Sequence, residues 1–220
     1  SAPDPSVRLR TRCRFARIRP VRPVRSDVKE AGVRTRVVTI FGSSTPEPLS
    51  PPYQDAYELG RALAQAGWTV CNGGYGGTME AAARGAHEVG GHTIGVTCSI
   101  FGRRGGANRY IQQEVPTFDL HARLNTLVRL AHAYVVLPGG TGTLLELALV
   151  WELYSKGLTR RAAPLILFGT HWTPLIGILR AQQDELLEPF VASSAADVVE
   201  FLRHEWATAP DADDAPSPTP

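Results

Sequence analysis

The stretch Leu137-Pro138-Gly139-Gly140-Thr141-Gly142-Thr143-Leu144-Leu145-Glu146 predicts how this chain folds. The apolar run at 133–137 is typical of a buried strand, and residues 144–154, rich in Leu, Ala and Glu, are typical of a helix. A glycine-rich turn therefore joins the end of a strand to the start of a helix. The first N–H groups of a helix lack intrahelical partners and carry partial positive charge, which favours a bound phosphate or carboxylate. The residues expected to bind such a group are Gly139, Gly140, Thr141, Gly142 and Thr143.

The same stretch also fits a purely structural role. Residues 143–146 have the form of a capping box, in which Glu146 would only satisfy backbone N–H groups at the helix start. The turn is not a dinucleotide fingerprint, because Leu145 stands where a third glycine is required. It is not a Walker loop either, because no Lys-Ser/Thr pair follows the glycines. At this point an anion site and a structural turn are both open.

Two further turns have the same character. Residues 72–80, Asn-Gly-Gly-Tyr-Gly-Gly-Thr-Met-Glu, lie between a strand predicted at 68–71 and a helix predicted at 81–89. A loop of small residues follows the strand predicted at 36–41. In an open parallel sheet such turns gather at the carboxyl edge of the strands, where ligands bind. The sequence therefore adds these candidate substrate-binding residues: Gly42, Ser43, Ser44, Gly73, Gly74 and Glu80.

Predicted strands and helices alternate along the chain. The remaining strands are expected at 92–97 and 164–169, with a short extended piece at 115–118. The remaining helices are expected at 53–66, after Asp119, at 172–187 and at 195–205. This alternation predicts βαβ units, and hence an α/β, Rossmann-like three-layer fold with a mostly parallel sheet. Its expected bounds are 37–206.

The expected domain is flanked by segments of different composition. Residues 1–36 hold 11 of the 23 basic side chains and 3 of the 21 acidic ones, with several prolines. They are predicted to be a basic, disordered extension, with an organellar transit segment as the alternative. Residues 207–220, made largely of Pro, Asp and Ala, are predicted to be a disordered tail.

Composition also bears on partners and compartment. Residues 37–220 have a net charge of −6, which argues against a nucleic-acid partner. Cys13, Cys71 and Cys98 are few and far apart, which favours a reducing, cytoplasmic compartment over a disulfide framework. No apolar run approaches membrane-spanning length, so no membrane partner is expected. The histidines show no metal-ligand spacing, and no metal site is predicted.

From about Val37 to Leu202 the chain resembles the LOG (Lonely Guy) family of cytokinin-activating nucleoside 5′-monophosphate phosphoribohydrolases, often labelled lysine decarboxylase-like. The resemblance rests on the loop at 42–44, the turn at 73–79, Arg123, and the pattern Pro-Gly-Gly-x-Gly-Thr-x-x-Glu at 138–146, the family signature. The chain departs from the family in three places. Leu124 replaces a lysine, Leu145 replaces an acid, and residues 77–80 replace Gly-Leu-Met-Gly. These departures leave the preferred base open.

The resemblance implies hydrolysis of the N-glycosidic bond of AMP or N6-substituted AMP, giving a free base and ribose 5-phosphate. It implies Arg123 and Glu146 as the catalytic residues, no cofactor, and a homodimer. Trp151 and Tyr154, on the helix that begins in the site, add to the expectation of a dimer.

Other functions remain to be weighed. A non-catalytic carrier of a nucleotide or a molybdopterin-type cofactor would share this fold and these loops. A pyridoxal phosphate decarboxylase would need a Schiff-base lysine, and Lys156, the one lysine after residue 36, lies beyond the site helix. A dehydrogenase is disfavoured because the loop at 41–44 is not a Rossmann fingerprint.

Overall fold

The computed structural model describes residues 36–101, 106–159, 163–183 and 185–208. The predicted extension up to residue 35 and the predicted tail from residue 209 lie outside the described residues. Within the described residues, seven parallel strands form one sheet in the order β4-β3-β2-β1-β5-β6-β7. The strands are β1 (Val37–Phe41), β2 (Thr69–Asn72), β3 (Thr93–Cys98), β4 (Gln113–Thr117), β5 (Ala133–Val136), β6 (Leu165–Phe168) and β7 (Phe190–Ala192).

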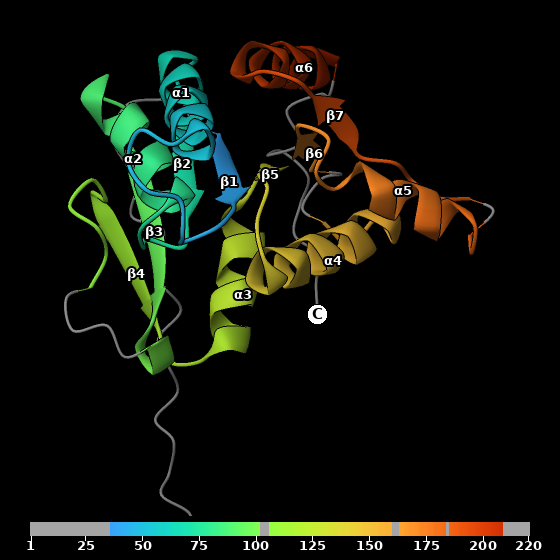
Figure 1. Ribbon diagram of the computed structural model, residues 1–220, viewed down its shortest axis with the longest axis horizontal. Helices are drawn as coiled ribbons and strands as arrows, with labels where there is room; N and C mark the ends of the chain where they lie inside the picture. The colour runs from blue at the N-terminus through green and yellow to red at the C-terminus, as the bar shows by residue number, and fades with distance from the viewer. Residues whose placement is uncertain (1–35, 102–105, 160–162, 184, 209–220) are drawn as a thin grey trace, which may run out of the picture. The chain divides into compact units, whose positions relative to one another are not determined.

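Helices cover both faces of this sheet (Figure 1). They are α1 (Pro51–Gln65), α2 (Thr78–Glu88), α3 (Leu120–Leu130), α4 (Thr141–Ser155), α5 (Thr173–Arg180) and α6 (Ala195–Thr208), with a short 3-10 turn at Ser99–Phe101. Buried side chains of α1, α2 and α6 share one hydrophobic cluster with the sheet, and those of α3, α4 and α5 share the other. The predicted Rossmann-like α/β fold is confirmed, and the sheet is entirely parallel.

The strand order places the glycine-rich turns next to each other. β1 lies between β2 and β5, and Phe41 at its end is in register with Val136 of β5. Successive strands from β1 to β4 are added toward one edge of the sheet, and those from β5 to β7 toward the other edge, so the order of the strands reverses between β1 and β5. This is the switch point at which open α/β sheets bind ligands. The loops that follow β1 and β5 both start there.

Several element boundaries differ from those predicted. α1 begins at Pro51 because proline suits the first helical positions, where no intrahelical N–H bond is lost. α4 begins at Thr141 and α2 at Thr78, three residues earlier than predicted in each case, so the glycine-rich turns end sooner. β7 was not predicted, because three residues are too few to show a periodic pattern. α5 ends at Arg180.

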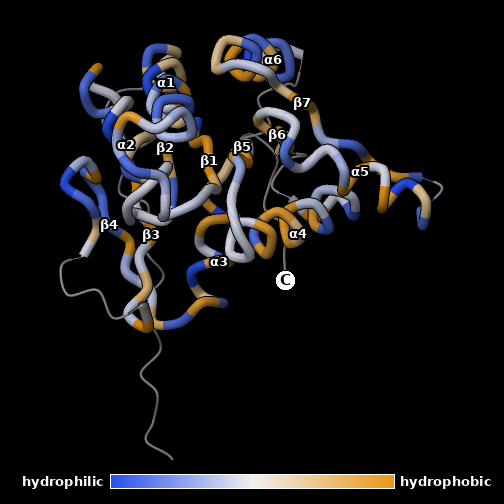
Figure 2. The backbone as a smooth tube through the Cα atoms, in the orientation of Figure 1, coloured by the Kyte–Doolittle hydropathy of each residue, from blue (hydrophilic) through white to orange (hydrophobic). Residues whose placement is uncertain are grey.

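Apolar residues concentrate in the central strands and along α4 (Figure 2). β5 and β6 are buried at every position, since helices cover them on both sides. None of the helices in the described part of the chain has the length and apolar character needed to cross a bilayer.

Candidate active site

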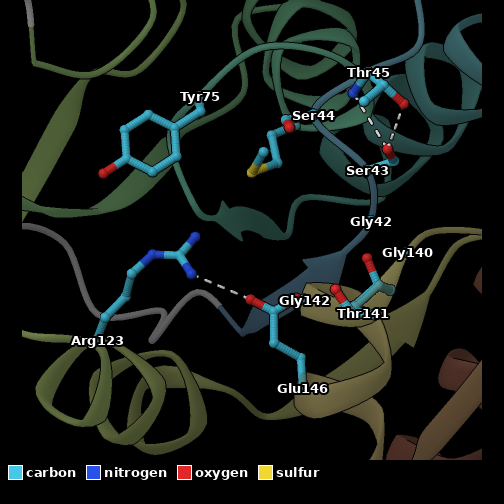
Figure 3. A pocket seen from close by; sticks show the side chains of 12 residues that line it. Gly42, Ser43, Ser44, Thr45, Tyr75, Arg123, Gly140, Thr141, Gly142 and Glu146 are labelled. Atoms are coloured by element: carbon cyan, nitrogen blue, oxygen red, sulfur yellow. Dashed lines mark hydrogen bonds and ion pairs between the residues drawn. The ribbon is translucent and has the colours of Figure 1, made fainter. Parts of the chain in front are cut away.

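A pocket of about 470 Å³ opens at the switch point (Figure 3), within the range of roughly 300–1,000 Å³ typical of small-ligand sites. Its lining brings together nine of the residues singled out from the sequence: Gly42, Ser43, Ser44, Arg123, Gly140, Thr141, Gly142, Thr143 and Glu146. Three more lining residues, Thr45, Tyr75 and Met79, were not predicted. All three lie within the predicted turns, so their position in those turns was the available signal.

The start of α4 forms one wall of the pocket. Its N-cap is Gly140, no side chain caps it, and its first turn holds no acid. The first intrahelical bond runs from Leu144 N to Gly140 O at 2.9 Å, so the helix leaves the preceding N–H groups without internal partners. Apart from the adjacent residues and the backbone of α4 itself, no atom lies within 4 Å of where a Cβ would stand at Gly140 or Gly142, and neither has a positive φ. The fold therefore does not require glycine at either position, whereas a ligand close to the backbone would.

The start of α2 is used differently. The backbone N and the Oγ1 of Thr78 both donate to Ser43 O, at 2.9 and 3.0 Å. The N-terminus of α2 therefore holds the loop after β1 in place. Gly74 and Glu80 do not line the pocket, so the structure gives no counterpart to their predicted contact with substrate.

Two other predicted glycines also lie outside the lining, and each makes room for a neighbouring side chain. A Cβ on Gly139 would come within 2.2 Å of Thr143 Oγ1, so glycine lets the chain turn against the first turn of α4. A Cβ on Gly73 would come within 1.8 Å of a terminal nitrogen of Arg123. The structure thus places Gly73 behind the arginine, where it leaves space for the guanidinium.

Arg123 on α3 and Glu146 on α4 meet at the pocket (Figure 3). Both are buried, with 6% and 8% of their surface exposed. Arg123 Nη1 donates to Glu146 Oε1 at 3.2 Å, and Arg123 Nε donates to Val96 O of β3 at 3.0 Å. Asp119 caps α3, as predicted, by accepting from Ala122 N at 2.7 Å, and so sets where the helix carrying Arg123 begins.

The alternative role of Glu146 in a capping box is wrong. Thr143 is the third residue of α4 and not its N-cap, and the carboxylate of Glu146 accepts from Arg123. Gly140 takes the N-cap position in an extended conformation, which begins the helix before the Thr143–Glu146 pattern can cap it.

Burial raises the pKa of Glu146 to about 7, an effect that the positive charge of Arg123 and its hydrogen bond only partly oppose. The carboxyl group therefore ionises near neutral pH. A carboxyl group with such a pKa suits proton transfer, and its charged form suits stabilisation of positive charge. Among the described residues, no group of three or more His, Cys, Asp or Glu could hold a metal ion.

One expected contributor to a dimer interface is not available. Trp151 is 4% exposed and donates from Nε1 to Leu187 O at 2.9 Å, so it belongs to the core beside α4. The large apolar side chains that α4 does expose are Leu144 and Leu145. The homodimer stays a prediction.

Comparison with known proteins extends these observations. Cytokinin riboside 5′-monophosphate phosphoribohydrolase of Mycobacterium tuberculosis is 37% identical over 150 residues, covering 64% of this chain and 74% of that protein. The cytokinin riboside 5′-monophosphate phosphoribohydrolase LOG of Oryza sativa is 28% identical over 166 residues, covering 74% of this chain and 66% of that protein.

Solved structures share the fold. The molybdenum cofactor binding protein of Rippkaea orientalis matches with a TM-score of 0.63 at 26% identity, over 80% of this chain and 99% of that one. The molybdenum cofactor carrier protein of Chlamydomonas reinhardtii matches with a TM-score of 0.64 at 24% identity, over 80% of this chain and all of that one, and shows the fold alone. Residues 35–159, which carry every lining residue of the pocket, match the SLOG cluster4 family. The chain belongs to the SLOG cluster4 family.

Proposed function

We propose that this protein hydrolyses the N-glycosidic bond of a purine nucleoside 5′-monophosphate, AMP or N6-substituted AMP, to release the free base and ribose 5-phosphate. The observation that carries this proposal is the buried pair of Arg123 and Glu146 facing the uncapped start of α4 within one pocket. The relatives from Mycobacterium tuberculosis and Oryza sativa, whose names state this activity, support it.

The 5′-phosphate would bind at the start of α4. Gly142, Ser43 and Ser44 line the pocket, so the N–H groups at the helix start and the serine hydroxyls are the groups that would bind the phosphate. Glu146 lies five residues after Thr141, which corresponds to about 7 Å along the helix axis. Helical side chains lean toward the N-terminus, so the carboxylate is directed back toward the bound anion. A ribose attached to the phosphate would then lie beside Glu146.

Cleavage places positive charge on the ribosyl ring as the bond from C1′ to the base nitrogen breaks. The carboxylate of Glu146 would stabilise that charge and accept a proton from the water whose oxygen bonds C1′. The base would leave with the electron pair of the broken bond and take up a proton from solvent, so that one water is consumed for each bond cleaved. Arg123 donates hydrogen bonds to Glu146 and to Val96 of β3, so it would hold the carboxylate in place.

A carrier of a molybdopterin-type cofactor is the second candidate, and the similarity to the Rippkaea orientalis protein favours it. The uncapped start of α4 would serve either function. The buried carboxylate tells against a carrier, however, because a negative charge beside an anion site weakens anion binding and burial makes that charge costly. In hydrolysis the negative charge of Glu146 would stabilise the positive charge that develops on the ribosyl ring.

The two candidates are separated by incubating the protein with AMP, an N6-substituted AMP, GMP and adenosine, and detecting free base by chromatography. We expect adenine and ribose 5-phosphate from AMP and no reaction with adenosine, which lacks the phosphate. The matched control is Glu146→Gln, which keeps the shape of the side chain without its charge. If AMP raises the melting temperature but none of the three nucleotides yields free base at stoichiometric enzyme, the carrier function is favoured and hydrolysis is refuted.

A further inference from the structure

Strand β3 is longer than its neighbour β2, and this leaves part of its edge without a strand partner. The register of the two strands ends where Asn72 of β2 pairs with Gly95 of β3. β3 continues to Cys98, paired on its other side with β4. The backbone N–H and C=O groups of alternate residues point toward the same neighbouring strand, so those of Val96 and Cys98 point to the side of β3 that β2 borders only as far as Gly95. Buried backbone groups on that side need other hydrogen-bond partners.

Two side chains of the pocket supply these partners. Arg123 Nε donates to Val96 O at 3.0 Å. The hydroxyl of Tyr75 accepts from Cys98 N at 2.7 Å and donates to Cys98 O at 3.2 Å. Arg123 and Tyr75 are thus anchored two residues apart on one strand. The Arg123 guanidinium carbon lies 5.7 Å from the centre of the Tyr75 ring, and Figure 3 shows the two side chains next to each other.

We propose that Tyr75 is a positioning residue: held by the end of β3, its ring keeps the guanidinium of Arg123 where it bonds the carboxylate of Glu146. An arginine side chain has much rotamer freedom, which must be restricted if one nitrogen is to meet one carboxylate. A ring face attracts a guanidinium, and that attraction is stronger when both are shielded from water. Gly73, in the same turn as Tyr75, packs against the guanidinium as well.

The proposal has a measurable electrostatic consequence. Arg123 is the charged group that lowers the pKa of Glu146 against the effect of burial. On β2, Cys71 also lies near Arg123, but burial raises the pKa of its thiol to about 12, so this group stays neutral. If Arg123 moves away from Glu146, desolvation is less opposed and the pKa of Glu146 rises further. The importance of Tyr75 for catalysis rests on the proposed function, whereas its effect on the position of Arg123 does not depend on that function.

The test is a titration of the Glu146 carboxyl carbon by ¹³C NMR, with the signal assigned through Glu146→Gln. In Tyr75→Leu, which lacks the ring, we expect the pKa of Glu146 to rise by on the order of one unit. The pH dependence of AMP hydrolysis should move by the same amount. In Tyr75→Phe, which keeps the ring but loses the two bonds to Cys98, we expect a smaller rise in the pKa of Glu146 than in Tyr75→Leu, together with a lower melting temperature.

Tyr57→Phe is the matched control, because it removes a phenol hydrogen bond, to Glu88 at 2.7 Å, outside the pocket. It should leave the titration of Glu146 unchanged. Should Tyr75→Leu not fold, Tyr75→Met fills more of the space without a ring and carries the same expectation. A folded Tyr75→Leu or Tyr75→Met protein that titrates as the wild type does would overturn the proposal. Because the titration needs no turnover, failure to hydrolyse both AMP and N6-substituted AMP would refute the proposed function and leave the positioning role of Tyr75 standing.

Discussion

Replacing Glu146 by glutamine should greatly lower turnover and at the same time stabilise the protein at alkaline pH. Glutamine keeps an oxygen that can accept from Arg123 but carries no charge. If the carboxylate stabilises the ribosyl cation, its loss should lower turnover on the order of 100-fold or more. Binding of AMP should survive, because the phosphate contacts at the start of α4 are untouched.

The effect on stability follows from the pKa of Glu146, which the fold raises from 4.5 to about 7. A carboxyl group with a raised pKa in the folded state contributes stability that is fully present below pH 4.5 and is lost as pH rises through about 7. The wild type therefore loses about 3 kcal/mol of its unfolding free energy across this window, and Glu146→Gln does not. For a chain of this length the difference corresponds to roughly 6–12 °C in melting temperature.

Melting temperatures of the two proteins measured from pH 4 to pH 8.5 provide the test. We expect the curves to coincide near pH 4 and to separate progressively above it, with the variant the more stable at pH 8. Every other titrating group is common to both proteins, so the difference isolates Glu146. Equal melting temperatures at pH 8 would refute the assignment of a desolvated carboxylate, and wild-type turnover in the variant would refute its catalytic role.

Gly73→Ala would place a Cβ 1.8 Å from a nitrogen of Arg123 and should displace the guanidinium. Turnover should then fall about 100-fold, while AMP affinity measured by calorimetry stays unchanged. Gly76→Ala is the control, because its Cβ would have a single contact at 3.9 Å, and it should change neither turnover nor affinity. The Cβ added by Gly142→Ala would have no neighbouring atom within 4 Å outside α4 itself, so the free energy of unfolding should rise by up to about 1 kcal/mol. AMP affinity should fall at least about tenfold, and unchanged affinity would show that the phosphate does not bind at this position. The kcat/KM for AMP should fall as pH drops below about 7, because Glu146 becomes protonated; a rate profile that is flat from pH 5 to pH 8 would contradict this. Light scattering should give about twice the 23.8 kDa chain mass, and a monomer at micromolar concentration would rule out the homodimer.

The local pattern of the chain was enough to predict the alternation of strands and helices and the turns between them. β5, the glycines after it and the apolar helix α4 follow from residues close together in sequence, and so does the cap that Asp119 provides for α3. Parallel pairing follows from that alternation as well. These features depend on propensity and on contacts within a few residues, which a sequence displays directly.

The partners of Glu146 could not be decided from local pattern. Thr143 and Glu146 have the spacing of a capping box, yet the helix begins before them and Glu146 bonds Arg123, 23 residues away on another helix. Which turn would offer its helix terminus to a ligand was also undecided, since both are rich in glycine. The Ser43 carbonyl occupies the start of α2, and the start of α4 is uncapped.

What the sequence determined by itself was the set of residues at the carboxyl edge of the sheet, because strand direction and turn position bring them there whatever the details of packing. Only the tertiary structure decided what each residue of that set contacts. Gly73 makes room for Arg123, and Tyr75 completes the end of β3, because β2 stops three residues short of it. Such roles depend on relative strand length, burial and side-chain direction between distant segments, and these quantities exist only once the chain has packed.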